Sequence, residues 1–536
     1  MWQLLSPTTL ELIFMILRDG SETTSLGRVQ LSRLSRVCTS WSMIALKLLW
    51  ASCDDFSRLL SALSDDILLH LRENAGETQE LQTTIPHADL GRFSMYAHQI
   101  RDLMYDHRTI GTAFQLTSAT MLQLCSQMKR PFINLRRLHF TSFDIKGWYI
   151  IPYLLGPTTT HLVLDVRSDV VDQQLVQHLA TMKDALSDVI NVAPNLRTLV
   201  IKIEKEHELL FGVLSRFIVG LRILRKIQVP LGGPSLPSTL YHLSSSAHLV
   251  VADLNIYPGS LDVDQLRFPP GAFPSLRTLN FSSKISIYLP LIHSIQLSTL
   301  NSVQLTFHEH SPCPTETFHT LIQATCRATS SLQVFELKIV APTSHRQLSN
   351  LPTAAVLLPL FAHRKLEELV IDLGVPIQLN DADIDTISHM WSYCRKLRLT
   401  PLDAQQRSLE SAGWTSKVTP RGIIALLYHL VNLRELAIEF DATSLDVVGT
   451  EGPVSEPYLP YRQVGSDGHL QARKTSSLEI LDVGRSVAAD PLKVASWIGV
   501  LCPRLKELKW TGDSEAWARA RLVLQKIQRL YESNEL

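Results

Sequence analysis

The chain has 536 residues, of which 45% are hydrophobic, and its 51 basic residues balance 51 acidic residues. This hydrophobic content is that of a folded protein, and the length allows about two to four domains, or one small domain followed by a repeat array. A chain without net charge lacks the basic surface of most nucleic-acid-binding proteins, so we expect no nucleic-acid partner.

Cysteine usage and hydropathy indicate an intracellular, soluble protein. The seven cysteines include no C-x-x-C pair, which fits reduced thiols. The N-terminus lacks a basic region and Glu11 interrupts its apolar stretch, so a signal peptide is not predicted. The apolar run from Ile423 to Val431, typical of the longest, contains His429 and is too short to cross a bilayer. We therefore expect no membrane contact, and either the cytoplasm or the nucleus.

Residues 5–50 are predicted to form two or three short helices. Thr8-x-x-Glu11 fits a capping box, and Ser6-Pro7 offers a competing N-cap and first-turn pair. Apolar residues recur at helical spacing on both sides of a polar stretch from Arg18 to Gln30. A module of this size cannot bury all its apolar surface, so some of it should meet a partner or the next domain. The apolar residues are Leu10, Ile13, Phe14 and Leu17, then Leu31, Leu34, Cys38, Trp41, Ile44, Ala45 and Leu48.

Residues 54–130 are mostly helical in pattern and are predicted to be a linker or N-terminal cap. One apolar stripe begins at Phe56, residues 73–85 are polar and predicted to loop out, and a second stripe runs from Phe93 to Leu103. The second stripe contains Phe93, Tyr96, Ala97, Ile100 and Leu103.

From Leu135 onward an L-x-x-L-x-L pattern recurs, at intervals of roughly 24 to 45 residues against the roughly 20 to 29 of leucine-rich repeats. The last two apolar positions of each copy alternate with an outward one, which is the period of a strand buried on one face. The copies are Leu135-Leu138-Phe140, Leu162-Leu164, Leu196-Leu199-Ile201, Leu224-Ile227-Val229, Val251-Leu254-Ile256, Leu276-Leu279-Phe281, Leu300-Val303-Leu305, Leu332-Phe335-Leu337, Leu366-Leu369-Ile371, Leu397-Leu399, Leu433-Leu436-Ile438, Leu478-Leu481-Val483 and Leu505-Leu508-Trp510.

Helical stripes lie between these copies, and several end at Pro-x-Leu, where proline stops the helix and turns the chain into a strand. Units of this kind stack into an α/β solenoid, with parallel strands on the concave face and helices outside, because no unit can bury its own apolar face. The predicted helices span residues 175–192, 318–326, 384–394, 423–430 and 494–501, with Asn380 or Asp381 as a cap of the third and Thr419-Pro420 opening the fourth.

The expected organisation is a helical module (1–53), a linker (54–130), an irregular leucine-rich-repeat-like solenoid (131–512) and a C-terminal capping helix (513–536), with Trp517 to Leu530 amphipathic. Three stretches interrupt the solenoid pattern: residues 230–237, 402–417 and 443–475. The last is predicted to be a mobile loop on its composition, although its Tyr458 and Tyr461 could form a contact point.

No catalytic motif appears, so an enzyme, a cofactor and a metal are not expected. The nearest approach to a zinc site is His308, His310, Cys313 and His319, but such irregularly spaced residues more often lie in a loop or core. Cys38 is expected to pack as a small hydrophobic residue. Basic residues beside the strands, as in LRRL, LRTL and LRKI, either form a solvated sheet face or line a charged surface that selects a ligand.

The residue order of the first stretch resembles the F-box, the helical motif that docks proteins onto the Skp-type adaptor of cullin-based ubiquitin ligases. The matching residues are Leu5 with Pro7, Glu11-Leu12-Ile13-Phe14, Val37-Cys38 with Trp41, Ile44-Ala45 and Leu49-Trp50. Ser6 between Leu5 and Pro7, and the polar stretch from Arg18, depart from the family pattern. The run from Phe93 to Leu103 is also similar to the linker of many fungal-type F-box proteins.

The resemblance implies a substrate-receptor subunit of a Skp-cullin-F-box ligase, which would bind the adaptor, and through it a cullin, and present a protein substrate on the solenoid. The substrate and the surface that binds it cannot be read from the sequence. A repeat scaffold whose N-terminal helices merely cap the array is the alternative, and an enzyme with an unrecognised site is a third. The residues expected to contact the adaptor are Leu5, Pro7, Leu10, Ile13, Phe14, Leu17, Leu34, Val37, Cys38, Trp41, Ile44, Leu49 and Trp50.

Overall fold

The computed structural model describes residues 6–19, 24–67, 90–106, 118–128, 130–142, 145–166, 172–203, 208–257, 268–309, 311, 313–340, 351–401, 415–443, 445, 463–464, 470–471, 476–511 and 514–534. The chain divides into two compact units. Unit 1 comprises residues 1–249 and 253–261, and unit 2 comprises residues 250–252 and 262–536.

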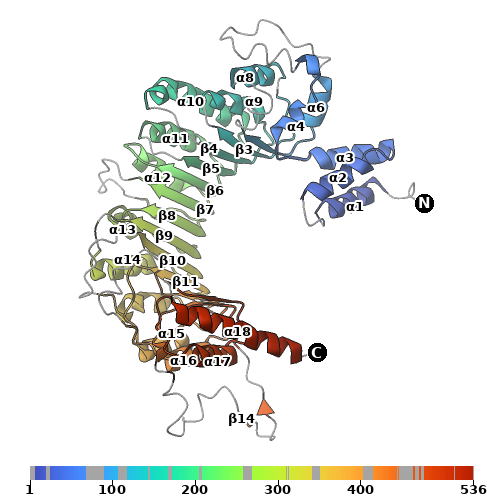
Figure 1. The fold of residues 1–536 in the computed structure, drawn as a ribbon. Coiled ribbons are helices and arrows are strands. Elements are labelled where there is room, and N and C mark those ends of the chain that lie inside the picture. Colours follow the sequence, from blue (N-terminus) through green and yellow to red (C-terminus); the bar gives the residue numbers. More distant parts are fainter. Residues whose placement is uncertain are drawn as a thin grey trace. The chain divides into compact units, whose positions relative to one another are not determined.

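Unit 1 begins with three helices and continues as alternating strands and helices (Figure 1). Its elements are α1 (Pro7–Asp19), α2 (Thr24–Leu34), α3 (Thr39–Trp50), β1 (Ser52–Cys53), α4 (Phe56–Leu60), α6 (Gly91–Ala97), β2 (Asp102–Asp106), α8 (Ser118–Gln127), β3 (Arg137–Ser142), the 3-10 helix η3 (Ile145–Ile150), α9 (Ile151–Leu154), β4 (His161–Val166), α10 (Asp172–Val192), β5 (Thr198–Ile203), α11 (Glu208–Gly220), β6 (Lys226–Leu231), α12 (Leu236–Ser245) and β7 (Val251–Ile256), whose first two residues are assigned to unit 2.

Unit 2 repeats the alternation and ends on a long helix. Its elements are β8 (Thr278–Ser283), α13 (Ile285–His293), β9 (Ser302–His308), α14 (Thr315–Ala328), β10 (Val334–Val340), the 3-10 helix η7 (Ala354–Ala362), β11 (Glu368–Asp372), α15 (Asp381–Met390), β12 (Lys396–Arg398), α16 (Pro420–His429), β13 (Glu435–Ala437), β14 (Gln463–Val464), β15 (Leu470–Gln471), β16 (Ile480–Asp482), α17 (Pro491–Leu501), β17 (Glu507–Lys509) and α18 (Glu515–Asn534).

Within each unit the strands are parallel and follow chain order, apart from β14 and β15, which form a separate antiparallel pair. Helices α8 to α12 lie on one side of the strands of unit 1, and α13 and α14 lie on one side of strands β8 to β10 in unit 2 (Figure 1). The predicted α/β repeat solenoid is therefore confirmed. None of the helices within the described ranges is long and apolar enough to span a membrane.

The core follows from strand register, because each strand places its buried residue beside that of its neighbour. Leu138 lies between Leu103 and Leu162 in the sheet, and Leu305 is a partner of Leu337. All of these side chains are buried. Full burial of one leucine side chain stabilises a fold by about 1.5–3 kcal/mol, so these columns supply the main cohesion between repeats.

The sheet begins earlier than predicted. Strand β1 lies just before the stretch expected to be a helical linker, and β2 lies within that stretch. The two strands pair in parallel, with residue 52 opposite residue 102. Helix α6 ends at Ala97, and Leu103 lies in β2. The spacing Ile100-x-x-Leu103-x-Tyr105 is itself a copy of the repeat pattern, and all three of these side chains are buried.

Residues 24–30, within the polar stretch from Arg18 to Gln30, form the first turns of α2. Two further sequence predictions need correction. In β7 the buried residues are Ala252, Leu254 and Ile256, so the copy starts at the buried Leu249 and Val251 faces outward. The turn-forming stretch 230–237 is shorter than expected, because β6 runs to Leu231 and α12 begins at Leu236.

The predicted helices of the solenoid are present with small shifts at their ends. Asn380 caps α15 in a capping box with Asp383, and Thr419 caps α16 ahead of Pro420. Helix α18 packs beside α17, and the indole Nε1 of Trp517 donates a hydrogen bond to the Ser486 carbonyl at 2.6 Å. Tyr458, Tyr461 and most of the predicted loop at 443–475 lie outside the described residues.

Candidate functional site: an exposed apolar surface on the N-terminal helices

The three N-terminal helices share one small core. Five residues from the three helices are buried together, and six partly buried apolar residues pack around them. The buried five are Leu10, Phe14, Leu31, Ala45 and Leu48, and the surrounding six are Ile13, Met15, Leu34, Trp41, Ile44 and Leu49. A core of this size leaves a short module close to the limit of independent stability.

Specific contacts fix how the helices lie in this module. The Ser6 hydroxyl accepts a hydrogen bond from the Thr9 amide at 3.2 Å, so Ser6 is the cap of α1. The capping box predicted for Thr8 and Glu11 is therefore corrected: the Glu11 carboxylate pairs with the Lys47 ammonium of α3 at 2.9 Å. The Phe14 ring meets Trp41 edge to face, with ring centroids 5.4 Å apart.

The module is also attached to the start of the sheet. The Trp50 ring stacks on Tyr96 of α6, with centroids 4.6 Å apart and an interplanar angle of 15°. Arg28 of α2 donates to the Asp54 carboxylate at 2.5 Å and to the Ser52 carbonyl at 2.7 Å. These contacts give α1–α3 a defined position within unit 1.

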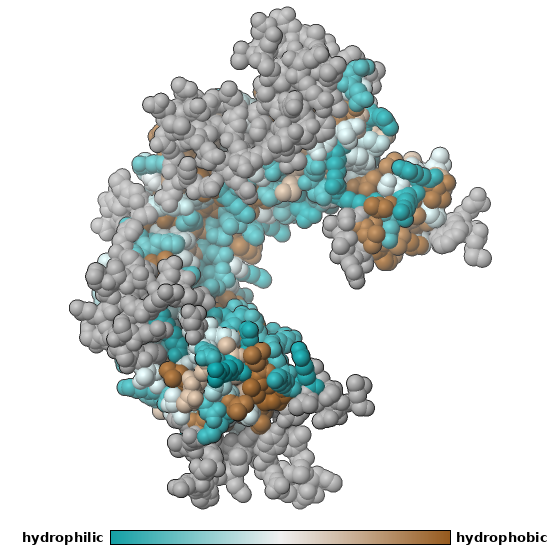
Figure 2. Space-filling view, in the orientation of Figure 1, coloured by the Kyte–Doolittle hydropathy of each residue, from teal (hydrophilic) through white to brown (hydrophobic). Residues whose placement is uncertain are grey.

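Large apolar side chains are concentrated on the outside of this module. Residues 6–50 hold seven of the 22 exposed large hydrophobic residues found in the described part of the chain. Figure 2 shows hydrophobic residues gathered over α1–α3. The seven are Leu12, Ile16, Leu17, Leu26, Val29, Val37 and Met43. Such a gathering on a folded surface marks a site of protein contact, whereas single exposed apolar residues are ordinary.

The residues expected to contact an adaptor fall into three groups by exposure. Leu10 and Phe14 are 5% and 2% exposed, so they support the module from inside and have no surface to offer a partner. Ile13, Leu34, Trp41, Ile44, Leu49 and Trp50 are half-buried. The exposed members are Pro7, Leu17, Val37 and Cys38, so Cys38 does not pack inside as expected. Leu5 lies outside the described residues.

Leu12, Ile16, Leu26, Val29 and Met43 were not singled out as contacts from the sequence, although all five are exposed. Leu12 and Ile16 are four residues apart on α1 and therefore share a face, while the buried Leu10 and Phe14 define another. The sequence signal that could have identified Leu12 and Ile16 as contacts was this second apolar stripe on a short helix. A helix that is apolar on two sides is expected to be covered on both.

A buried ion network lies on the strands near the end of unit 2. The Arg398 guanidinium bridges Glu435 at 2.6 Å and Asp482 at 2.8 Å, and all three side chains are less than 20% exposed. Nearby, the buried Glu439 accepts a hydrogen bond from the Arg485 amide at 3.2 Å. Burial raises the pKa of Glu439 to about 7, and the Arg485 amide opposes this only in part.

Glu439 makes the stability of unit 2 depend on pH. Between its ordinary pKa of 4.5 and about 7, an unfolded chain loses the proton that the folded chain retains. Stability should therefore fall as pH rises through this window, by at most about 3 kcal/mol. Urea unfolding midpoints measured at about pH 5 and about pH 8 check this. Glu439→Gln should remove the contribution of Glu439 to the pH dependence of stability, whereas Glu507→Gln, at an exposed site, should not. An equal pH dependence in the wild type and in Glu439→Gln would contradict the assignment.

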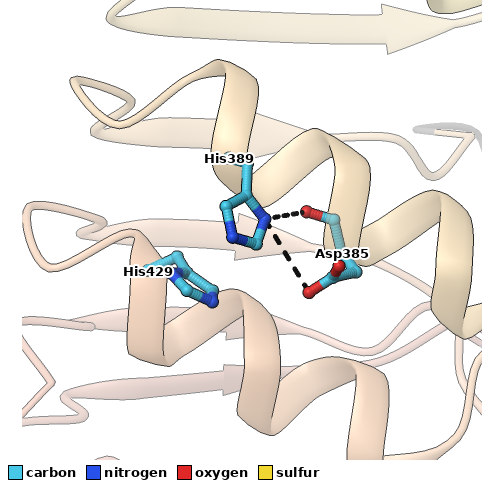
Figure 3. A group of neighbouring side chains, drawn as sticks. All are labelled: Asp385, His389 and His429. Atoms are coloured by element: carbon cyan, nitrogen blue, oxygen red, sulfur yellow. Dashed lines mark hydrogen bonds and ion pairs between the residues drawn. The ribbon is translucent and has the colours of Figure 1, made fainter.

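Among the residues that the structure describes, a group of potential metal ligands lies on the helical side of unit 2. Asp385 and His389 of α15 and His429 of α16 place ligand atoms within 4.8 Å of one another (Figure 3). The Nδ1 atom of His389 lies 2.8 Å from the Asp385 carbonyl, which leaves Nε2 as its free nitrogen. Asp385 and His389 are exposed, so a cation here would keep positions open to water.

The zinc candidate considered from the sequence is not assembled in the described residues. His308 ends β9 and His319 lies in α14, and neither belongs to a group of three potential ligands. His310 lies outside the described residues.

No protein-family model matches the chain, and no curated protein matches it. Among solved structures, a chain of the crystal structure of the Rad7 and Elc1 complex in yeast is similar at 13% identity, over 87% of this chain and 94% of that chain, with a TM-score of 0.36. A likeness at this score does not bear on what the present chain binds.

Proposed function

We propose that this chain is the substrate-receptor subunit of a Skp-cullin-F-box type ubiquitin ligase. Helices α1–α3 would bind the Skp-type adaptor, and through it a cullin, while the solenoid would hold a protein substrate. The receptor would need no catalytic residue or cofactor, because holding a substrate beside the ubiquitin-charged enzyme raises the effective concentration of its lysines. Its place would be the cytoplasm or the nucleus.

The apolar surface of α1–α3 is the observation that carries this proposal. Five side chains fill the interior of the module, and seven others remain exposed around it. Apolar area removed from water contributes about 25 cal/mol per Å², so covering several such side chains would stabilise a complex substantially. The F-box-like residue order of the same stretch gives the chemistry of the partner.

Two exposed residues of this surface provide a direct test in the full-length chain. Ile16 and Val37 are 62% and 60% exposed, so Ile16→Asp with Val37→Asp should leave the fold intact. Each carboxylate would have to lose water on docking, which is costly without a partner. We expect co-purification with a Skp-type adaptor to fall at least about tenfold.

Val487 and Leu492 of unit 2 form a matched control, since they are 59% and 62% exposed. Val487→Asp with Leu492→Asp should capture as much adaptor as the wild type. Wild-type capture by the Ile16/Val37 variant would rule out docking through this surface, as would equal losses in the two variants.

The contacts of Trp50 and Arg28 favour a second candidate function. They attach α1–α3 to the first strands, as expected of a cap on a repeat scaffold with no role in ubiquitin transfer. A cap of this kind would bind no adaptor, so absence of adaptor capture by the wild-type chain would favour the scaffold.

A further inference from the structure

Positive charge is in excess at the starts of strands β2 to β6 of unit 1, taken together. Two positions matter: the residue immediately before the strand and the first residue of the strand. Across β2 to β6 these positions hold six cations and one anion, Asp102. We call the six cations the basic row: Arg101, Arg136, Arg137, Arg197, Arg225 and Lys226.

The same positions in unit 2 provide an internal comparison. Across β8 to β17, without the separate β14–β15 pair, they hold five cations and five anions. Several of these charges neutralise one another, as in Arg395–Glu367 at 3.5 Å, Lys396–Glu435 at 3.5 Å and Lys506–Glu479 at 2.7 Å. The excess of positive charge is therefore particular to unit 1 and not a property of the repeat.

All six members of the basic row are exposed. Arg137 pairs with Asp102, at 2.5 and 2.7 Å, and the other five form no ion pair with any described residue. Backbone hydrogen bonds set these residues side by side: the Arg136 amide donates to Arg101 at 2.6 Å, and the Arg225 amide donates to Arg197 at 2.7 Å.

The half-buried His161, between Arg137 and the later strands, responds to this charge. Burial lowers the pKa of its imidazole, and Arg137, Arg197 and Lys226 lower it further against the opposing effect of Asp102. These three cations therefore lie close enough to His161 to act on it electrostatically.

We infer that the basic row binds an acidic segment of a protein partner, through carboxylates of aspartate or glutamate side chains. Arginine forks match carboxylates in paired hydrogen bonds, and such contacts are stronger than neutral ones. Parallel strands lie about 4.8 Å apart, so the row spans about 19 Å from β2 to β6. An extended segment of about six residues would cover it.

A nucleic acid fits this surface less well. The chain has no net charge, and single-stranded nucleic acid usually binds where aromatic rings accompany the cations. The third residue of each of these five strands is not Phe, Tyr or Trp. These third residues are Met104, His139, Val163, Val200 and Gln228.

The inference deepens the proposed function, since within that function the acidic segment would belong to the substrate. It is tested on the full-length chain without adaptor, by fluorescence anisotropy of a labelled peptide of about eight residues rich in glutamate. We expect saturable binding that weakens with added salt, and at least about tenfold weaker binding of the same peptide with every glutamate replaced by glutamine.

Charge reversal at matched positions locates the site. Arg197→Glu with Arg225→Glu should weaken binding of the glutamate peptide at least about tenfold. Arg395→Glu with Arg434→Glu, at the same strand positions in unit 2, should leave it unchanged. Equal binding of the glutamate and glutamine peptides, equal effects of the two double variants, or tighter binding of a labelled single-stranded oligonucleotide would overturn the inference.

Adaptor capture by the same variants keeps the two proposals separable. Arg197→Glu with Arg225→Glu should capture adaptor as the wild type does, because neither residue lies in α1–α3. If the wild-type chain captures no adaptor but still binds the glutamate peptide, the ligase role is contradicted and the acidic-segment site stands.

Discussion

Replacing Phe14 with alanine is expected to unfold the N-terminal helices locally while the solenoid stays folded. Removing a buried phenylalanine side chain costs about 3–5 kcal/mol. Phe14 is 2% exposed and meets Trp41 edge to face, in a core of only five buried residues. A module this small has little stability to lose, so the helices α1–α3 should open as one unit.

Hydrogen exchange of the full-length chain measures this effect by region. In Phe14→Ala, amides of α1–α3 should exchange much faster, while those of β8 to β11 keep their wild-type rates. Leu12→Ala is the matched control, because Leu12 lies on the same helix and is 55% exposed. If Phe14→Ala exchanges at the wild-type rate, the five-residue core does not hold the module.

Replacing Arg398 with alanine should strongly destabilise unit 2. The guanidinium lies between Glu435 and Asp482. Its removal leaves the largely buried Asp482 without this cation, and leaves Glu435 with the longer Lys396 contact at 3.5 Å. Breaking a buried ion pair in this way costs about 3–5 kcal/mol. The three residues come from β12, β13 and β16, so the loss should loosen adjacent strands of the sheet together.

Arg395→Ala supplies the comparison for Arg398→Ala. Arg395 precedes the same strand, but its side chain is 62% exposed and its nearest carboxylate, on Glu367, is 3.5 Å away. Exposed pairs contribute about 0–1 kcal/mol, so its loss should be small. Urea unfolding midpoints of the two variants measure this difference in stability. Similar midpoints would show that the Arg398 ion pairs contribute no more to stability than an exposed pair.

The repeat pattern predicted most of the strands because burial on one face imposes alternation that is visible in the residue order. Prediction failed where inward and outward positions did not differ in polarity. In Leu249-Val250-Val251-Ala252 every residue is apolar, so the inward positions could not be separated by pattern alone. In α2 the polar residues before Leu31 gave no helical pattern, although they are part of the helix. Gly27 is buried, so the face of α2 that carries it is packed.

The site could be predicted only in part, since residue order carries identity but not exposure. Leu10 and Leu12 have the same chemistry, yet one lies in the core and the other on the surface. The Arg398 network was out of reach for another reason. Arg398 and Asp482 are 84 positions apart and meet only because the repeats stack.

The central claim is that α1–α3 dock a Skp-type adaptor through their exposed apolar surface. Hydrogen exchange of the full-length chain with and without a purified adaptor tests it most directly. The adaptor should slow exchange in residues 6–19 and 24–50 and leave strands β8 to β17 unchanged. Unaltered exchange in α1–α3 at a saturating adaptor concentration, or protection confined to the solenoid, would contradict the claim.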